Sequence, residues 1–205
     1  MTVDLGIQGL SVERGSHICA FYSGDFERTE ILVPFVKEAM RAGDRCICLV
    51  DLAEAETIEQ ALEAETSKRG DIDESWLMMQ PAVQSYLVNG RFDSDHMLAF
   101  WVSTFEDAMA RGWPFVRIIS EASWTIRDIP GINEFMVYEA KYNEISRPYP
   151  HVTVCLYDFD VFGPEMLIAI LKTHPFVLVG GVVHENPDYM QPDEFRASRE
   201  HGLLG

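Results

Sequence analysis

Short apolar runs alternate with amphipathic helical stretches along most of this chain, and that alternation limits the folds open to it. The first unit is an apolar run at 17–22, a turn at Ser23-Gly24, a helical stretch from Asp25 to Gly43 and a second apolar run at 45–50. Apolar runs without polar alternation are typical of parallel strands that are covered on both faces. Since each parallel crossover needs a connection of about a dozen residues, the pattern predicts a mainly parallel sheet between two helical layers.

The remaining elements follow the same alternation. Further strands are predicted at 77–80, 115–120, 151–157 and 176–183, and further helices at 52–68, 93–112, 132–142 and 164–172. We divide the chain into a loose lead-in at 1–14, a single α/β domain at 15–196 and a C-terminal tail at 197–205, at the end of a polar stretch that begins at 188. The predicted fold class is a three-layer α/β sandwich with a mainly parallel central sheet.

The composition argues against several functional classes. A chain of 205 residues that is 47% hydrophobic can bury one full core. It has 33 acidic and 16 basic side chains, a net charge of −17 and no cluster of Lys or Arg, so direct binding to nucleic acid or to an anionic membrane is not expected. The longest apolar run, 176–183, is too short to cross a bilayer. We therefore expect a cytoplasmic protein.

Polar side chains gather where the predicted strands end. In an open parallel sheet, ligands bind outside the carboxyl ends of the strands, where loops and helix N-termini meet. Part of this polarity arises because Asp and Asn cap helices, so ordinary turns are the alternative to a ligand site. The strand-end residues are Tyr22, Ser23, Asp25, Asp51, Glu121, Trp124, Tyr157, Asp158, Asp160, His184, Glu185 and Asn186.

Three histidines lie near the ends of predicted strands. His17 begins the first strand and is either a site residue or a histidine held by the backbone there. His174 precedes the last predicted strand, whereas His184 follows it. We therefore expect these two histidines at opposite ends of the sheet, with His174 in a structural role.

Motifs for metal binding and catalysis are absent from the sequence. It has neither two His at helical spacing nor Cys-x-x-Cys, and it has no Gly-x-Ser-x-Gly. Asp158 and Asp160 flank Phe159 in what reads as a turn. We assign no catalytic residue, metal ligand or cofactor. One conceivable metal site would combine His17, Cys19, Glu121 and His184. All four cysteines lie in apolar runs, and we expect them to be buried, reduced thiols: Cys19, Cys46, Cys48 and Cys155.

The turn after the first strand has the layout of a phosphate-binding loop without its chemistry. Such a loop wraps the anion with backbone N–H groups, while a Lys neutralises it and a Ser or Thr holds Mg²⁺. Residues 22–29 read "YSGDFERT" and contain no Lys. Asp25 and Glu27 fall where phosphates would lie and would repel them. We predict a nucleotide-binding architecture that has lost ATP hydrolysis.

Several motifs in order resemble one known family. They are "HICAFY", "LVPFVKEAMRAGDRCICLVD", "GRFD", "SEASW", "IPGINEFMVYEAKYN", "CLYDFDVFGPEMLIAILKTHP" and "VHENPDYMQPDEF". From Gly15 to Arg196 the chain looks like the MEDS domain, the DcmR-like sensory domain of methanogens and methylotrophs. The resemblance implies a RecA-like or KaiC-like fold without a working phosphate loop, acting in prokaryotic signalling and transcription regulation. The family is thought to sense small hydrocarbon derivatives, and its name derives from a regulator that responds to dichloromethane.

The resemblance also implies site residues and partners. Members are fused to DNA-binding domains, histidine kinases or sigma-factor regulators. Little sequence lies outside the match here, so we expect signalling by contact with a separate kinase, an anti-sigma factor or its antagonist; no sequence feature supports a homo-oligomer. The family's polar motif positions correspond to His17, Cys19, Tyr22, Glu121, Trp124, Tyr157, Asp158, His174, His184, Glu185 and Asn186, and we take all of these except His174 as ligand-binding candidates.

Three hypotheses about function follow. The first is a non-enzymatic sensor that binds a small, mostly apolar ligand near Tyr22, Glu121, Trp124 and His184. The second is a degenerate RecA-like enzyme that binds a nucleotide or metal, with Glu121 or His184 as general base and Asp158 on the metal. The third is an interaction module whose crevice is filled by its own side chains.

Overall fold

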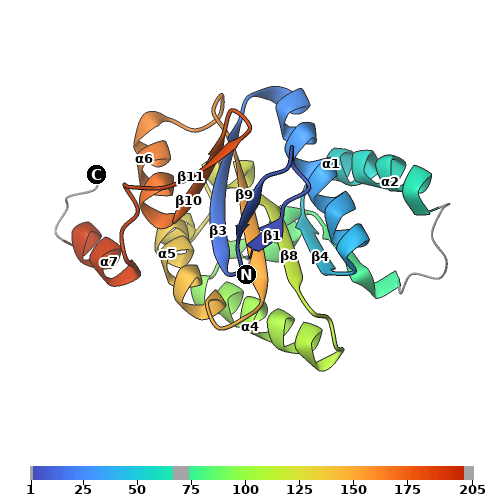
Figure 1. Ribbon diagram of the computed structural model, residues 1–205. Coiled ribbons are helices and arrows are strands. Elements are labelled where there is room, and N and C mark those ends of the chain that lie inside the picture. The colour runs from blue at the N-terminus through green and yellow to red at the C-terminus, as the bar shows by residue number, and fades with distance from the viewer. Residues whose placement is uncertain (1, 67–73, 201–205) are drawn as a thin grey trace.

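A sheet of seven strands is the middle layer of the computed structural model, which describes residues 2–66 and 74–200 (Figure 1). Its spatial order is β11-β10-β3-β9-β8-β4-β5, and every neighbouring pair is parallel except β10 and β11. The predicted three-layer, mainly parallel α/β fold is confirmed. The strands are β3 (Ser16–Tyr22), β4 (Arg45–Leu49), β5 (Leu77–Gln80), β8 (Val116–Glu121), β9 (His151–Asp158), β10 (Phe176–Val179) and β11 (Val182–Glu185).

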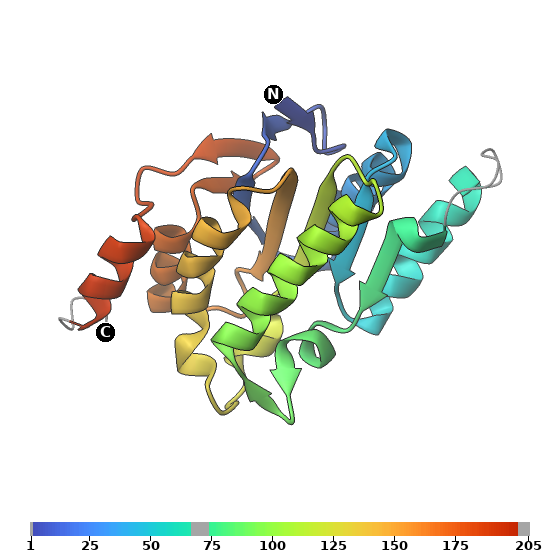
Figure 2. The same ribbon diagram turned by 90° about the horizontal axis from the view of Figure 1, so that it is seen from below.

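Helices cover both faces of this sheet. One face packs against α1 (Gly24–Ala42) and α2 (Leu52–Thr66), and the other packs against α4 (Ser94–Ala110), α5 (Phe135–Ser146) and α6 (Pro164–Thr173), as Figure 2 shows for α4 and α5. Strand residues alternate between the faces: Cys46 and Cys48 point toward α1, whereas Ile47 and Leu49 point toward α4. This burial on both sides is why the strands read as continuous apolar runs.

Local signals set the ends of several helices. Gly43 adopts a left-handed conformation with φ of 75°, and its N–H bonds to the carbonyls of Ala39 and Met40, which ends α1 as predicted. Asp93 accepts a hydrogen bond from the His96 N–H at 2.9 Å and caps α4. Pro34 lies inside α1. The predicted end of the second helix, near residues 68–70, falls outside the described residues.

The first residues are ordered, so the predicted loose lead-in is wrong. Strands β1 (Thr2–Asp4) and β2 (Ser11–Glu13) form an antiparallel hairpin that places Leu5, Ile7 and Val12 in the core on the α1 face. Buried Arg117 of β8 donates to Asp44 Oδ2 and to the Asp4 carbonyl, both at 2.7 Å. That contact fixes the hairpin to the sheet.

The last predicted strand is in fact a hairpin. Gly180 and Gly181 have φ of 57° and 75°, the left-handed conformations that a tight two-residue turn requires. Strand β10 therefore reverses into β11, and His184 lies opposite Val177 in antiparallel register. His184 and Glu185 consequently lie at the amino edge of the parallel strands, not at the carboxyl edge as predicted. His174 and His184 are thus at the same end of the sheet.

The remaining elements are short. The stretch predicted as a polar tail forms α7 (Pro192–Glu200), which packs against α5 and α6 through the buried Phe195. No helix in the described ranges has the length and apolar character needed to span a membrane. The other elements are α3 (Ala82–Tyr86), β6 (Leu87–Val88), β7 (Arg91–Phe92) and the 3₁₀ turns η1 (Glu74–Trp76), η2 (Ser123–Ile126) and η3 (Ile132–Glu134).

Gly131, in the loop before α5, lies against the backbone of β7, whereas Gly90 has no such neighbour. Gly131 has φ of +87°, and a Cβ there would lie 2.2 Å from the Phe92 carbonyl oxygen, whereas Gly90, with φ of +75°, faces open space. We expect Gly131→Ala to lower the free energy of unfolding by about 3 kcal/mol through backbone strain and displacement of β7. Gly90→Ala should lower it by about 1 kcal/mol, through strain alone. Urea unfolding followed by circular dichroism measures both, and equal losses would contradict the close contact.

Candidate functional site

The predicted strand-end residues do not converge on one cavity. Tyr22 and Glu121 lie on the α1 face, where the Tyr22 hydroxyl donates to Glu121 Oε1 at 3.4 Å. Trp124 lies on the opposite face, in an aromatic group with Tyr86 and Phe135 at ring distances of 4.9 and 5.4 Å. The sheet therefore lies between Trp124 and the Tyr22–Glu121 pair. Their role in ligand binding stays a prediction.

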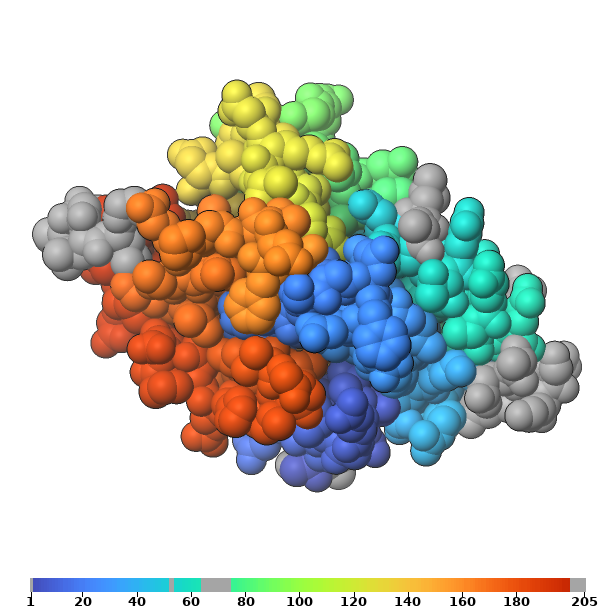
Figure 3. All heavy atoms as spheres, turned by 90° about the horizontal axis from the view of Figure 1, so that it is seen from above, coloured from blue at the N-terminus to red at the C-terminus, as the bar shows by residue number. Residues whose placement is uncertain are grey.

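The crevice at the topological switch point is closed by the chain itself. The switch point lies between β3 and β9, because the connections from these strands run in opposite directions. The Phe159 N–H donates to the Tyr22 carbonyl at 2.9 Å, and the Ser23 hydroxyl donates to Asp160 Oδ2 at 2.7 Å. The Phe21 and Phe159 rings stack at 4.8 Å. Seen from the carboxyl edge, the segment near residue 160 (orange) meets the first turn of α1 (blue) (Figure 3).

Carboxylates surround the turn between β3 and α1. The Ser23 N–H, which begins the loop, donates to Glu27 Oε2 at 2.8 Å. Arg28 bonds to the buried Glu54 at 2.7 Å and to Asp25 at 2.8 Å. The cation nearest this loop is therefore already paired with acids. The predicted loss of ATP hydrolysis stays a prediction.

Glu121 is a buried acid among other acids. Burial raises its pKa, while the hydroxyl and the N–H of Ser123 donate to Oε1 and lower it; Asp51 and Glu54 raise it further. The pKa of the neighbouring Tyr22 hydroxyl is also raised, first by burial and then by the charge of Glu121. Tyr22 is thus held as a neutral donor beside this carboxyl.

A second polar group lies in the core under α5 and α6. It joins His17 of β3, Glu139 of α5, Cys155 of β9 and His174, the residue after α6, each at most 5% exposed. We call these four residues the His–Glu–Cys cluster. Oε2 of Glu139 is 3.3 Å from Nε2 of His17 and 3.4 Å from Nε2 of His174. Nε2 of His17 is also 3.3 Å from Sγ of Cys155.

Hydrogen bonds behind the cluster orient both imidazoles. His174 Nδ1 lies 2.8 Å from the Ile170 carbonyl, an acceptor, so Nδ1 carries the proton. His17 Nδ1 lies 3.1 Å from Asn143 Oδ1, and the Asn143 amide nitrogen is fixed by donating to the Thr173 carbonyl at 2.8 Å. His17 Nδ1 therefore donates as well. Both Nε2 atoms then face the carboxylate and the thiol.

The charges of the cluster follow from burial and from these contacts. Burial acts to raise the pKa of Glu139, but hydrogen bonds from His17 and His174 and their charges outweigh it and hold the pKa at about 2. Burial lowers the pKa of His17, and the charge of His174 lowers it further. Burial also raises the pKa of the Cys155 thiol. The interior thus contains an ionised carboxylate.

The sequence anticipated this cluster only in part. His17 was a candidate and Cys155 was correctly expected to be a buried thiol, but the combination of His17 with Cys19, Glu121 and His184 is wrong. Glu121 is on the other face, and His184 is exposed on β11. Glu139 was missed, although an acid between Phe135, Tyr138 and Tyr142 on one apolar helix face is an unusual signal.

Asn186, a predicted ligand-binding residue, makes structural hydrogen bonds with its side chain. Its side-chain amide donates to the carbonyls of Leu171 and His174 at 2.6 and 2.7 Å. The Leu171 carbonyl also accepts from the His174 N–H at 3.3 Å, so Asn186 closes the C-terminal end of α6 together with the backbone. Asn186 thereby helps to hold His174 in the cluster.

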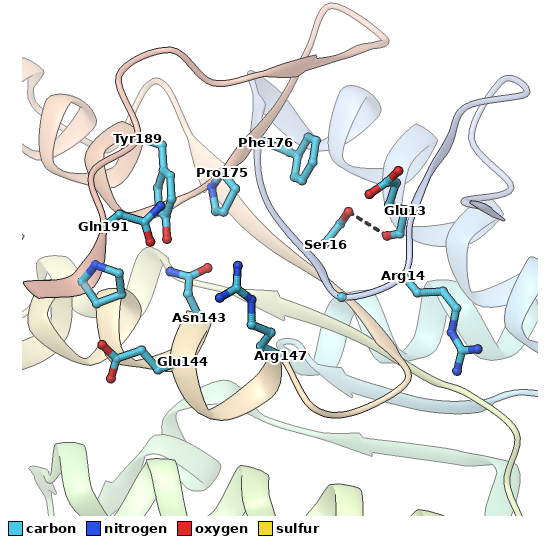
Figure 4. Close-up of a pocket in the computed structure, with 12 residues that line it drawn as sticks. Glu13, Arg14, Ser16, Asn143, Glu144, Arg147, Pro175, Phe176, Tyr189 and Gln191 are labelled. Carbon is cyan, nitrogen blue, oxygen red and sulfur yellow. Dashed lines mark hydrogen bonds between the residues drawn. The ribbon is translucent and has the colours of Figure 1, made fainter. Parts of the chain in front are cut away.

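Two grooves lie at the two ends of α5. The α5–α6 groove has a volume of about 440 Å³ and lies between the first turns of both helices; its lining residues include Ile132, Phe135, Met136, Met166, Ala169 and Thr125. The amino-edge groove has a volume of about 340 Å³ and is more polar, with Asn143 and Arg147 of α5 facing Tyr189 and Gln191 across it (Figure 4). Asn143 thus lines this groove and contacts His17.

The fold places this protein in the class of three-layer α/β domains with a mainly parallel sheet, an architecture that a KaiC-like protein shares. A KaiC-like protein from the archaeon Pyrococcus horikoshii OT3 superposes with a TM-score of 0.56 at 16% identity, over 86% of this chain and 80% of that one. The flagellar accessory protein FlaH from Methanocaldococcus jannaschii gives a TM-score of 0.46 at 12% identity, over 86% of this chain and 78% of that one.

Within that class, the chain belongs to the MEDS family, the methanogen/methylotroph DcmR sensory domain, whose model matches residues 16–175. The resemblance drawn from the sequence motifs is confirmed. The transcriptional repressor DcmR of Methylorubrum extorquens (strain DSM 6343 / CIP 106787 / DM4) is 24% identical over 170 residues. That match covers 82% of this chain and 61% of the repressor. The family is described as a sensory domain.

The ion pair between Arg28 and the buried Glu54 leads to a stability prediction. Arg28→Ala would leave Glu54 as an uncompensated buried carboxylate, so we expect the free energy of unfolding to fall by about 2–4 kcal/mol. Arg111→Ala removes an exposed ion pair to Asp107 on α4 and should have no measurable effect. Urea unfolding of both variants at neutral pH measures the difference. Equal stabilities would mean that the Arg28–Glu54 pair contributes nothing.

A buried histidine near the cluster predicts a pH dependence. His151 packs between Phe105 and Tyr142, and burial lowers its pKa from 6.5 to about 4. The folded protein binds this proton less readily than the unfolded chain, so stability is complete above pH 6.5 and falls as the pH drops toward 4. His151→Phe should reduce that slope by up to about 1.4 kcal/mol per pH unit. Urea unfolding at several pH values tests this, and an unchanged slope would refute it.

Proposed function

We propose that this chain is a non-enzymatic sensory domain that binds a small, mostly apolar molecule and regulates a separate signalling protein. Membership of a sensory-domain family and the similarity to a transcriptional repressor support the regulatory role. The carboxylates at the phosphate position argue for binding without nucleotide chemistry. The partner is a histidine kinase or a sigma-factor regulator, as the family's domain fusions imply.

The α5–α6 groove is the observation that supports a small, mostly apolar ligand. Its volume of about 440 Å³ is within the usual range for small-molecule sites. Ile132, Phe135, Met136 and Met166 form the apolar part of its lining, and the polar part comes from Thr125, Asn133, Glu165 and Arg199. Methionine side chains adapt their shape to irregular apolar ligands. The groove also lies at the first turns of α5 and α6, on the side where open α/β sheets bind ligands.

Binding in the groove can reach distant surfaces through α5. Phe135 and Met136 line the groove, Glu139 lies one turn further along, and Asn143 and Arg147 line the amino-edge groove. A ligand that prefers one position of α5 shifts the population of that position along the whole helix. A partner that contacts either end then responds to the ligand.

Methyl NMR with dichloromethane as the apolar probe tests the ligand site. Added to protein with labelled methionine methyls, dichloromethane should shift the Met136 and Met166 signals in a saturable way, because both side chains line the groove. The signal of Met109, exposed on α4, should not follow that curve. Ala169→Phe fills the groove and should weaken binding at least about tenfold.

The control is Ala110→Phe, which adds the same ring at an exposed position of α4 and should leave the probe's affinity unchanged. Shifts that grow linearly without saturation, or that affect Met109 as strongly as Met136, would contradict the proposed site.

A further inference from the structure

We propose that the His–Glu–Cys cluster binds one divalent transition-metal ion of the zinc class through His17 Nε2, His174 Nε2, a Glu139 carboxylate oxygen and Cys155 Sγ. These four ligand atoms all lie within 4.8 Å of one another. The inference goes beyond the sensory role and does not depend on a ligand in the α5–α6 groove.

The distances fit a tetrahedral site. Zinc binds imidazole nitrogen and carboxylate oxygen at about 2.0–2.1 Å and thiolate sulfur at about 2.3 Å, which places tetrahedral ligands about 3.3–3.5 Å apart. The two nitrogen–oxygen separations at Glu139 Oε2 are 3.3 and 3.4 Å, and the His17 Nε2–Cys155 Sγ separation is 3.3 Å. Three of the six edges of such a tetrahedron thus already have the required length, and the other three, each at most 4.8 Å, would shorten when the metal binds.

The groups behind the imidazoles match those of metal ligands. Metal-binding histidines donate their second ring N–H to a carbonyl or carboxyl group, which fixes the tautomer and orients the lone pair. Here the Ile170 carbonyl accepts from His174 Nδ1, and Asn143 Oδ1 accepts from His17 Nδ1. Both Nε2 atoms therefore face the Glu139 carboxylate, so each can donate a proton to it or, with a metal ion between them, offer that ion its lone pair.

Burial and charge favour the same occupant. His174 Nε2 is completely buried, and the Glu139 carboxylate faces it at 3.4 Å. A divalent ion bound by the Glu139 carboxylate and the Cys155 thiolate gives a neutral site. A neutral site removes the large cost of an uncompensated charge in the interior.

The ligand set also selects the metal and the kind of site. One sulfur and two imidazole nitrogens favour Zn²⁺ or Co²⁺ over Mg²⁺ and Ca²⁺, which prefer oxygen ligands. Four protein ligands leave no open position, as in structural zinc sites. The cavity beside His17, Glu139 and Cys155 is only about 10 Å³, so it has no room for a substrate.

Cobalt spectroscopy tests the site. The full chain is unfolded with a chelator, refolded without oxygen in the presence of Co²⁺, and analysed for bound metal. We expect one Co²⁺ per chain, intense tetrahedral d–d bands and a thiolate-to-cobalt charge-transfer band, with displacement by Zn²⁺. Cys155→Ser should lose the charge-transfer band, and His174→Ala should bind Co²⁺ at least about tenfold more weakly.

Cys48→Ser is the matched control, because Cys48 is an equally buried thiol on the α1 face, and its spectrum should equal that of the wild type. No cobalt bands in the wild type, or bands that survive both Cys155→Ser and His174→Ala, would overturn the proposal. Should those variants fail to fold, X-ray absorption of the Zn²⁺-loaded wild type decides, since any sulfur count other than one refutes the site.

Discussion

An ionised carboxylate in the middle of the core is the constraint on which this half of the fold depends. Glu139 is 2% exposed, so the charge it carries needs partners from every element around it. His17 brings β3 to it and His174 brings the end of α6, while Asn143 ties His17 to the Thr173 carbonyl. The positions of α5 and α6 on the sheet are therefore set by polar contacts as well as by apolar packing.

Helix α5 consequently connects three features that lie far apart in the sequence. Its first turn lines the α5–α6 groove, its middle holds Glu139, and its last turns line the amino-edge groove through Asn143 and Arg147. A helix moves most easily as a rigid body, so a shift at one groove changes both other sites. The polar contacts of Glu139 would resist that shift, because they tolerate less displacement than apolar packing does.

The sequence was sufficient for the architecture and insufficient for the site. Continuous apolar runs identify parallel strands reliably, and Gly43 and Asp93 mark helix ends. The run at 176–183 was predicted as one strand, but its two glycines reverse the chain in the middle of the run. His184 therefore lies at the amino edge of the sheet and not at the carboxyl edge. The cluster could not be found from spacing, since His17, Glu139, Cys155 and His174 meet only when β3 and β9 pair under α5. The order of strands in the sheet decides that meeting, and no local pattern encodes it.

The turn from β3 into α1 has the layout of a phosphate-binding loop but carries acids in place of the usual Lys. The turn from β3 into α1 still directs the chain across the sheet, but Glu27 now accepts the Ser23 N–H and Asp160 accepts the Ser23 hydroxyl. Carboxylates of the chain itself thus accept both polar hydrogens of Ser23 at the start of this turn. Polar chemistry has moved to the α4–α6 face, where buried imidazoles, a thiol and a carboxylate lie together. A domain built this way can respond to an occupant of that face without turning over a nucleotide.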